Sequence, residues 1–136
     1  MTPQEVFDKV TDHLARQKIQ AIDAIGACML KNAKGQMCAV GCLIPKEEYN
    51  FEMEEHSGLS FCAVGDISNI FSKWINDNYR DHIPLLSELQ EVHDQTVGIS
   101  GTYNWGYTLQ VLSKIHNLTF DKVKFEDNLA DSHYCY

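Results

Sequence analysis

The segment from residue 35 to residue 45 constrains the fold of this chain more than any other. It reads Gly-Gln-Met-Cys-Ala-Val-Gly-Cys-Leu-Ile-Pro, so two cysteines and two glycines interrupt an apolar run between a turn signal and a proline. The run is too short for its periodicity to separate a strand from a short buried helix. Because Gly41 weakens either element, we expect the backbone to pack closely against another segment there. Pro45 ends the element.

Hydrophobic periodicity predicts that most of the chain is helical. Thr2, Pro3 and Glu5 form the pattern of a capped helix start, and apolar residues then recur on one face until about Lys18. Three more helices are expected at about 66–79, 84–96 and 104–117, the first of them capped by Asp66.

The β component is expected to be small. Asn32 and Gly35 favour a turn between two short arms, which predicts a hairpin over about 28–38. Val123 and Phe125 could add a short edge strand. The predicted fold class is therefore α+β, mostly helical, with about four helices packed with one small β-hairpin.

A chain of 136 residues corresponds to a single domain, which we place at residues 1–126 with a loosely held tail at 127–136. No apolar run is long enough to cross a membrane, and the N-terminus lacks the features of a signal peptide. We therefore expect a cytoplasmic protein with no membrane partner and no cofactor.

The net charge of −8 comes from 11 basic and 19 acidic residues, which argues against direct binding of nucleic acid. It favours a protein partner with a basic surface. The strongest acidic cluster consists of Glu47, Glu48, Glu52, Glu54 and Glu55. These carboxylates form either a contact surface or an ordinary solvated face.

The five cysteines are expected to be reduced thiols, most of them packing residues. Cys38 follows a turn, where a cysteine nucleophile can be activated, and His93 with Asp94 could supply a base and the group that orients it. The alternative is that His93 is a packed core residue, because it lies at helical spacing from leucines.

A zinc site is a second possibility for the same cysteines. Cys38 and Cys42 have the spacing of a ligand pair, and His56 and Cys62 could complete four ligands. There is no second tight pair, so small apolar packing residues are the simpler interpretation of both cysteines. Tyr103 and Tyr107 lie one turn apart and could instead flank a groove for a small ligand.

Two segments carry a family resemblance. Residues 34–49 contain the pattern Gly-x-x-Cys-Ala-Val-Gly-x-Leu-Ile-Pro, and residues 85–94 read Leu-Leu-Ser-Glu-Leu-Gln-Glu-Val-His-Asp. Together with the opening helix, they resemble a group of small, mostly uncharacterised proteins encoded by phages and prophages. The resemblance implies an accessory protein that acts in the cytoplasm of the host cell, but it implies no particular activity.

Three functions therefore remain open at the level of the sequence. The first is a phage-type accessory protein that binds and inhibits a host protein, such as a defence component, through its acidic surface. The second is a cysteine-dependent enzyme that uses Cys38 and His93. The third is a sponge for a nucleotide or a signalling metabolite, with a pocket between the hairpin and the turn that holds Tyr103 and Tyr107.

Overall fold

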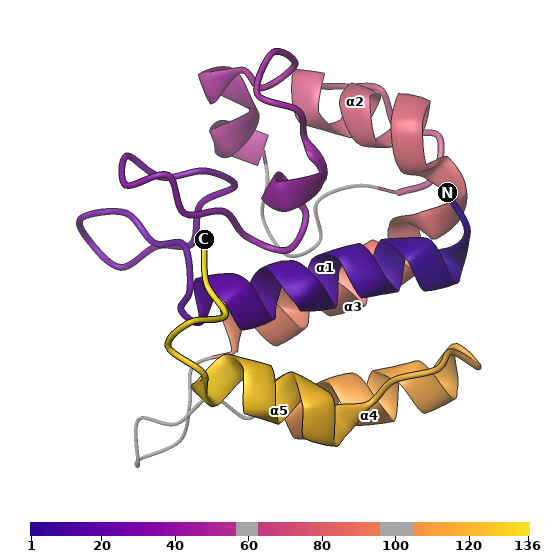
Figure 1. Ribbon diagram of the computed structural model, residues 1–136. Helices are drawn as coiled ribbons and strands as arrows, with labels where there is room; N and C mark the ends of the chain where they lie inside the picture. Colours follow the sequence, from indigo (N-terminus) through magenta and orange to yellow (C-terminus); the bar gives the residue numbers. More distant parts are fainter. Residues whose placement is uncertain (57–62, 96–104) are drawn as a thin grey trace.

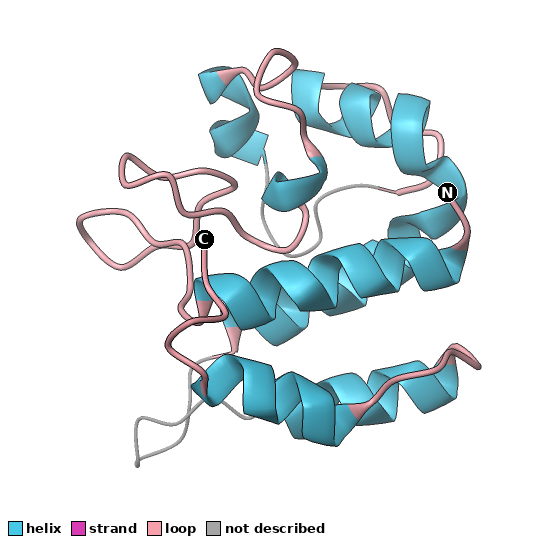
Figure 2. Cartoon of the chain, in the orientation of Figure 1, coloured by secondary structure: helices cyan, strands magenta, loops and turns pink. Residues whose placement is uncertain are grey.

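The computed structural model describes residues 1–56, 63–95 and 105–136, and the chain is mostly helical there, as predicted (Figures 1 and 2). The α-helices are α1 (Pro3–Gln17), α2 (Ile70–Tyr79), α3 (Ile83–Asp94), α4 (Trp105–Ile115) and α5 (Lys122–Ala130). Three short 3₁₀-helices are η1 (Gly41–Leu43), η2 (Phe51–His56) and η3 (Arg80–His82). None of the described helices is both long and apolar enough to cross a bilayer.

Helix α1 is the central element of the fold. Its capping box forms as predicted, because Thr2 Oγ1 accepts the Glu5 N–H at 3.1 Å and Glu5 Oε1 accepts the Thr2 N–H at 3.1 Å. In Figure 1, α3 lies behind α1, α4 and α5 lie below it, and α2 lies above it. The buried face of α1 contributes Val6, Phe7, Val10 and Leu14 to the core. Because residues on both sides of α1 are buried, this helix packs against both the upper and the lower part of the molecule.

Helix α2 starts later than predicted. Asn69, and not Asp66, is its N-cap, because Asn69 Oδ1 accepts the Ser72 N–H at 2.8 Å. Asp66 Oδ1 accepts the Ser68 N–H at 2.9 Å in the preceding turn. Asn and Asp are equally good capping residues, so local sequence could not choose between the two positions.

The predicted β-hairpin is wrong, although its turn is in the expected place. Asn32 N–H donates to Gln36 O at 2.9 Å, but the arms form only one isolated bridge, between Lys31 and Met37, with no strand in the described residues. The backbone groups that the next pair of the ladder would need are bonded elsewhere. The Leu30 N–H donates to Glu54 Oε1 at 2.9 Å, and Cys38 O accepts the Cys42 N–H at 3.1 Å. Such competition cannot be seen in the local pattern.

The run from 38 to 44 forms a buried turn that contains η1, and the expected close approach at Gly41 is confirmed. A Cβ atom at Gly41 would lie 2.0 Å from Leu30 O and 2.7 Å from Leu30 C. Both are backbone atoms, so no side chain can rotate away from the contact. The side chains of Cys38, Ala39, Val40, Leu43 and Ile44 are all buried.

The C-terminal region is helical, so the suggested edge strand is also wrong. Asp121 caps α5 by accepting the Lys124 N–H at 3.0 Å, and Phe125 is 5% exposed. Residues 127–130, which we had placed in a loose tail, belong to this helix. Beyond it, the Tyr134 hydroxyl donates to Asp12 on α1, and the Tyr136 hydroxyl lies 2.7 Å from His13 Nδ1.

Candidate functional site

The end of α3 carries a polar cluster that connects three parts of the chain. Gln90 Oε1 accepts the Val40 N–H at 3.1 Å, and Gln90 Nε2 donates to Asp94 Oδ1 at 2.9 Å. The Gln20 amide donates to the His93 carbonyl at 2.8 Å. The segment 90–94 therefore holds both the buried turn at 38–44 and the loop that follows α1.

His93 is fully buried, and both of its ring nitrogens have partners. Nε2 accepts the backbone N–H of Ala21 at 3.1 Å, and Nδ1 lies 2.7 Å from Asp94 Oδ1. Because a backbone N–H can only donate, Nε2 must be unprotonated, and the ring proton must be on Nδ1. The hydrogen bonds thus assign a neutral imidazole that donates to Asp94.

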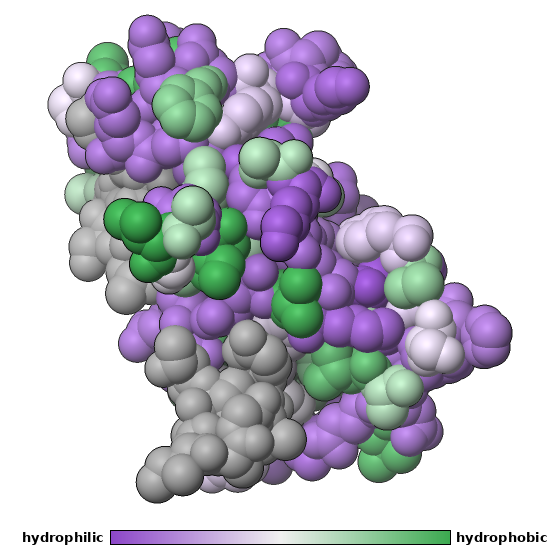
Figure 3. Space-filling view, turned by 90° about the vertical axis from the view of Figure 1, so that its left-hand side faces the viewer, coloured by the Kyte–Doolittle hydropathy of each residue, from purple (hydrophilic) through white to green (hydrophobic). Residues whose placement is uncertain are grey.

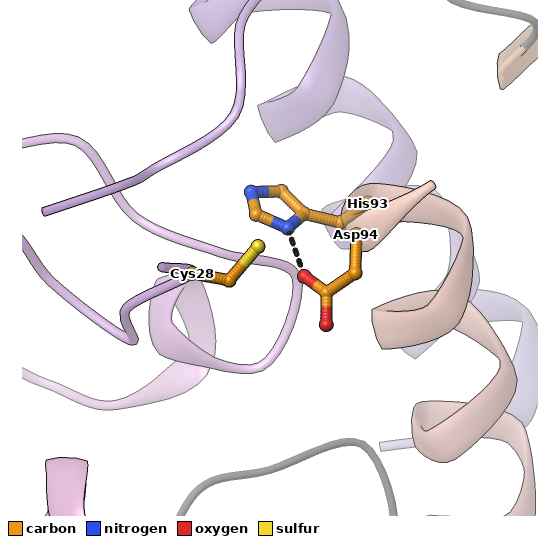
Figure 4. A group of neighbouring side chains, drawn as sticks. All are labelled: Cys28, His93 and Asp94. Atoms are coloured by element: carbon orange, nitrogen blue, oxygen red, sulfur yellow. Dashed lines mark hydrogen bonds and ion pairs between the residues drawn. The ribbon is translucent and has the colours of Figure 1, made fainter. Parts of the chain in front are cut away.

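Cys28 completes this group of side chains (Figure 4). One ligand atom each from Cys28, His93 and Asp94 lies within 4.8 Å of the other two. The residue as a whole is exposed, but its sulfur points toward the His93 ring and the Asp94 carboxylate. Partial burial, followed by the Asp94 carboxylate, raises the pKa of the Cys28 thiol to about 12. This thiol is therefore protonated at neutral pH.

These three residue types could in principle form a catalytic triad or bind a metal, but their arrangement fits neither. A catalytic histidine must present an unprotonated ring nitrogen to the nucleophile, whereas here the unprotonated Nε2 accepts the Ala21 N–H and Nδ1 carries the proton toward Asp94. A metal bound at His93 Nδ1 would displace the proton from that nitrogen. The proton could not move to Nε2, because Nε2 faces the Ala21 N–H. The cluster therefore holds the loops against α3 through hydrogen bonds.

The predicted pair of Cys38 and His93 is not joined by a hydrogen bond through the imidazole, since both nitrogens of His93 bond elsewhere. Cys38 is 1% exposed, and its sulfur accepts the Gly41 N–H at 3.2 Å. Burial raises the pKa of this thiol far above its usual range. Asp94 Oδ1 lies 2.7 Å from His93 Nδ1, and the thiol beside them is that of Cys28. No local motif marks Cys28, so the sequence did not identify it.

The four suggested zinc ligands are only partly described. Cys42 is half-buried, its thiol donates to Ala39 O at 3.1 Å, and burial raises its pKa to about 12. Cys62 lies outside the described residues, and the side chain of His56 is not described. Of the two tyrosines, Tyr103 also lies outside the described residues, and Tyr107 on α4 is 60% exposed.

The acidic segment forms a defined surface. Glu54 is half-buried and fixes the segment from within, because its carboxylate accepts the Leu30 N–H at 2.9 Å, the Lys31 N–H at 3.1 Å and the Tyr49 hydroxyl at 2.5 Å. Met53 is 2% exposed and anchors η2 in the core. The other predicted carboxylates are exposed, and we name Glu47, Glu48, Glu52 and Glu55 together the acidic face.

A space-filling view places this segment in its surroundings (Figure 3). The upper part of that view, where η2 lies, is mostly hydrophilic, and hydrophobic side chains gather lower down, at the height of the loops after α1. Ile25, at the tip of one loop, is 89% exposed. Within the segment of the acidic face, Phe51 is 71% exposed. The segment therefore carries an exposed aromatic side chain next to Glu52 in the sequence.

Comparison of the chain with protein-family models, with curated proteins and with solved structures finds no match.

Proposed function

We propose that this protein is a binding protein whose acidic face docks on a basic surface of a partner protein. The observation that carries the proposal is that Glu47, Glu48, Glu52 and Glu55 are exposed on a segment that Glu54 and Met53 fix to the core. Little conformational freedom of the backbone remains to be lost when such a segment binds. The net charge of −8 supports the proposal, because it steers a basic partner toward the molecule.

Phe51 adds an apolar contact to this surface. Binding energy at protein interfaces is concentrated in a few large side chains surrounded by polar ones. With 71% of Phe51 exposed next to Glu52, the segment combines an aromatic anchor with flanking charge. The partner surface that fits is an apolar hollow bordered by lysine or arginine.

The resemblance to phage and prophage proteins extends the proposal to the biological setting. It implies that the partner is a host protein, such as a defence component, that binding inhibits it, and that binding takes place in the cytoplasm of the host cell. These points depend on the motifs at 34–49 and 85–94 and remain part of the proposal.

The test compares two variants with the same net charge. In one, Glu52 and Glu55 are replaced by lysine; in the other, Asp127 and Asp131, which are also exposed, are replaced by lysine. The probe is a fluorescent oligolysine peptide, and binding is measured by anisotropy at low ionic strength, where surface charges act most strongly. We expect the first variant to bind at least about tenfold more weakly, and the second to lose much less affinity.

Equal weakening in the two variants would contradict the proposal, because it would show that the peptide responds to net charge and not to a defined face. Glu54 is left unchanged in this experiment. Its replacement would remove the acceptor of two backbone N–H groups and alter the fold of the segment.

A further inference from the structure

A small pocket lies beside the acidic face, at the junction of α2 with the segment after η1. Its volume is about 140 Å³. Leu43, Pro45 and Glu48 contribute from one side, and Trp74, Asn78 and Tyr79 contribute from α2. The N-terminal residue Met1 completes the lining, and its sulfur accepts the Tyr79 hydroxyl at 3.7 Å. Glu48 belongs both to the acidic face and to this pocket, so the two features are continuous.

The pocket has the chemistry of a cation site. The rings of Trp74 and Tyr79 lie 5.6 Å apart between centroids and are tilted by 43°, so they form two walls of different orientation. Ring faces of tryptophan and tyrosine attract cationic groups, and tryptophan does so most strongly. The Asn78 amide nitrogen donates to Trp74 O at 2.8 Å, which leaves the amide oxygen as the accepting group of that side chain.

The electrostatic environment points in the same direction. Burial, the Cys42 thiol and the Glu48 carboxylate, in that order, raise the pKa of Tyr79. Glu48 lines the same pocket and brings a carboxylate to it, and the N-terminal residue Met1 lines it as well. Pro45 supplies an apolar surface against which the aliphatic stem of a basic side chain can pack.

From these observations we propose that the pocket formed by Trp74, Tyr79 and Glu48 binds one lysine or arginine side chain of the basic partner. This inference rests on the proposed function, and it names a specific contact within it. The cationic group lies in the pocket, against this pair of packed rings and beside Glu48, and the neighbouring residues of the partner follow the acidic face. Binding involves no covalent step.

The test uses a probe too small to span the acidic face. N-acetyl-arginine methylamide, and in a second titration the lysine analogue, is added to isotope-labelled protein while the indole N–H signals are followed by NMR. We expect the Trp74 signal to shift in a saturable manner. The Trp105 signal is an internal reference, because that ring stacks on His93 with centroids 6.3 Å apart and is not part of the pocket.

Three variants make the result specific. Glu48→Gln and Tyr79→Leu should each weaken binding about tenfold, which corresponds to about 1.4 kcal/mol. Glu47→Gln removes an equal charge from the neighbouring position and should change the affinity less than about twofold. An unmoved Trp74 signal, or equal weakening by Glu47→Gln and Glu48→Gln, would overturn the inference.

The outcomes also separate this inference from the proposed function. If reversal of Glu52 and Glu55 abolishes oligolysine binding but Glu48→Gln and Tyr79→Leu do not affect it, the acidic face stands and the pocket inference is wrong. If the small probe binds as expected and the reversal has no more effect than its control, the pocket stands and the proposed docking face is wrong.

Discussion

Replacing Gly41 by alanine tests the packing of the buried turn most directly. The new Cβ atom would lie 2.0 Å from Leu30 O, whereas Cβ atoms in real structures do not approach heavy atoms closer than 3.0 Å. The two backbones would therefore have to separate by about 1 Å. Leu30 cannot move without loss, because its carbonyl accepts the Cys38 N–H at 3.0 Å and its N–H donates to Glu54 at 2.9 Å.

The expected destabilisation follows from these contacts. Forcing an extra methyl group into a packed region lowers the free energy of unfolding by about 1–3 kcal/mol. Weakening the buried hydrogen bond from Cys38 to Leu30 adds about 1–2 kcal/mol. We therefore expect Gly41→Ala to lower the free energy of unfolding by about 2–5 kcal/mol, measured by denaturant titration with circular dichroism.

Gly106→Ala is the matched control. Its Cβ atom would lie 2.5 Å from Glu126 Oε1, which is the end of an exposed, flexible side chain that can rotate away. Alanine also has a higher helix propensity than glycine by up to about 1 kcal/mol, so this variant should be neutral or slightly stabilised. The reasoning fails if Gly41→Ala loses less than about 1 kcal/mol or behaves like the control.

Two further predictions concern titration and reactivity. Burial lowers the pKa of His13 below 6.5, so the unfolded chain binds its proton more readily; stability should fall as the pH drops below about 6.5, by at most about 1.4 kcal/mol per pH unit. In unfolding titrations of His13→Gln this slope should shrink, and an unchanged slope would contradict the prediction. Cys28 and Cys135 are both exposed, but in timed iodoacetamide labelling near neutral pH Cys28 should react at least about tenfold more slowly until denaturant is added; equal rates in the native protein would refute the raised pKa of Cys28.

The candidate site could be predicted from the sequence only in part. The run of carboxylates was visible as composition, and their exposure follows from charge, which is rarely buried. The separate role of Glu54 was not visible, because it depends on the backbone N–H groups of Leu30 and Lys31 lying within reach. His93 and Asp94 are consecutive in the sequence, but only the fold brings Cys28 and the Ala21 N–H to them.

The sequence by itself determined the features that depend on neighbouring residues. The capping box at Thr2 and Glu5, the apolar faces of the helices and the turn at Asn32 all arise from interactions within about one turn of chain. The close approach at Gly41 was also expected, because a glycine in an apolar run indicates that another backbone lies near.

Only the tertiary structure decided the rest, because it depends on groups far apart in the chain. Glu54 accepts the Leu30 N–H and Cys38 O accepts the Cys42 N–H, so the next pair of the predicted hairpin cannot form and one bridge is left. Phe125 is buried in a helix that packs on α1, although the same residues also fitted the pattern of a strand. The pocket beside the acidic face needs Glu48 and Trp74 from separate segments. The local sequence pattern cannot specify contacts between segments that are far apart in the chain, since packing and hydrogen bonding across the fold override local preference.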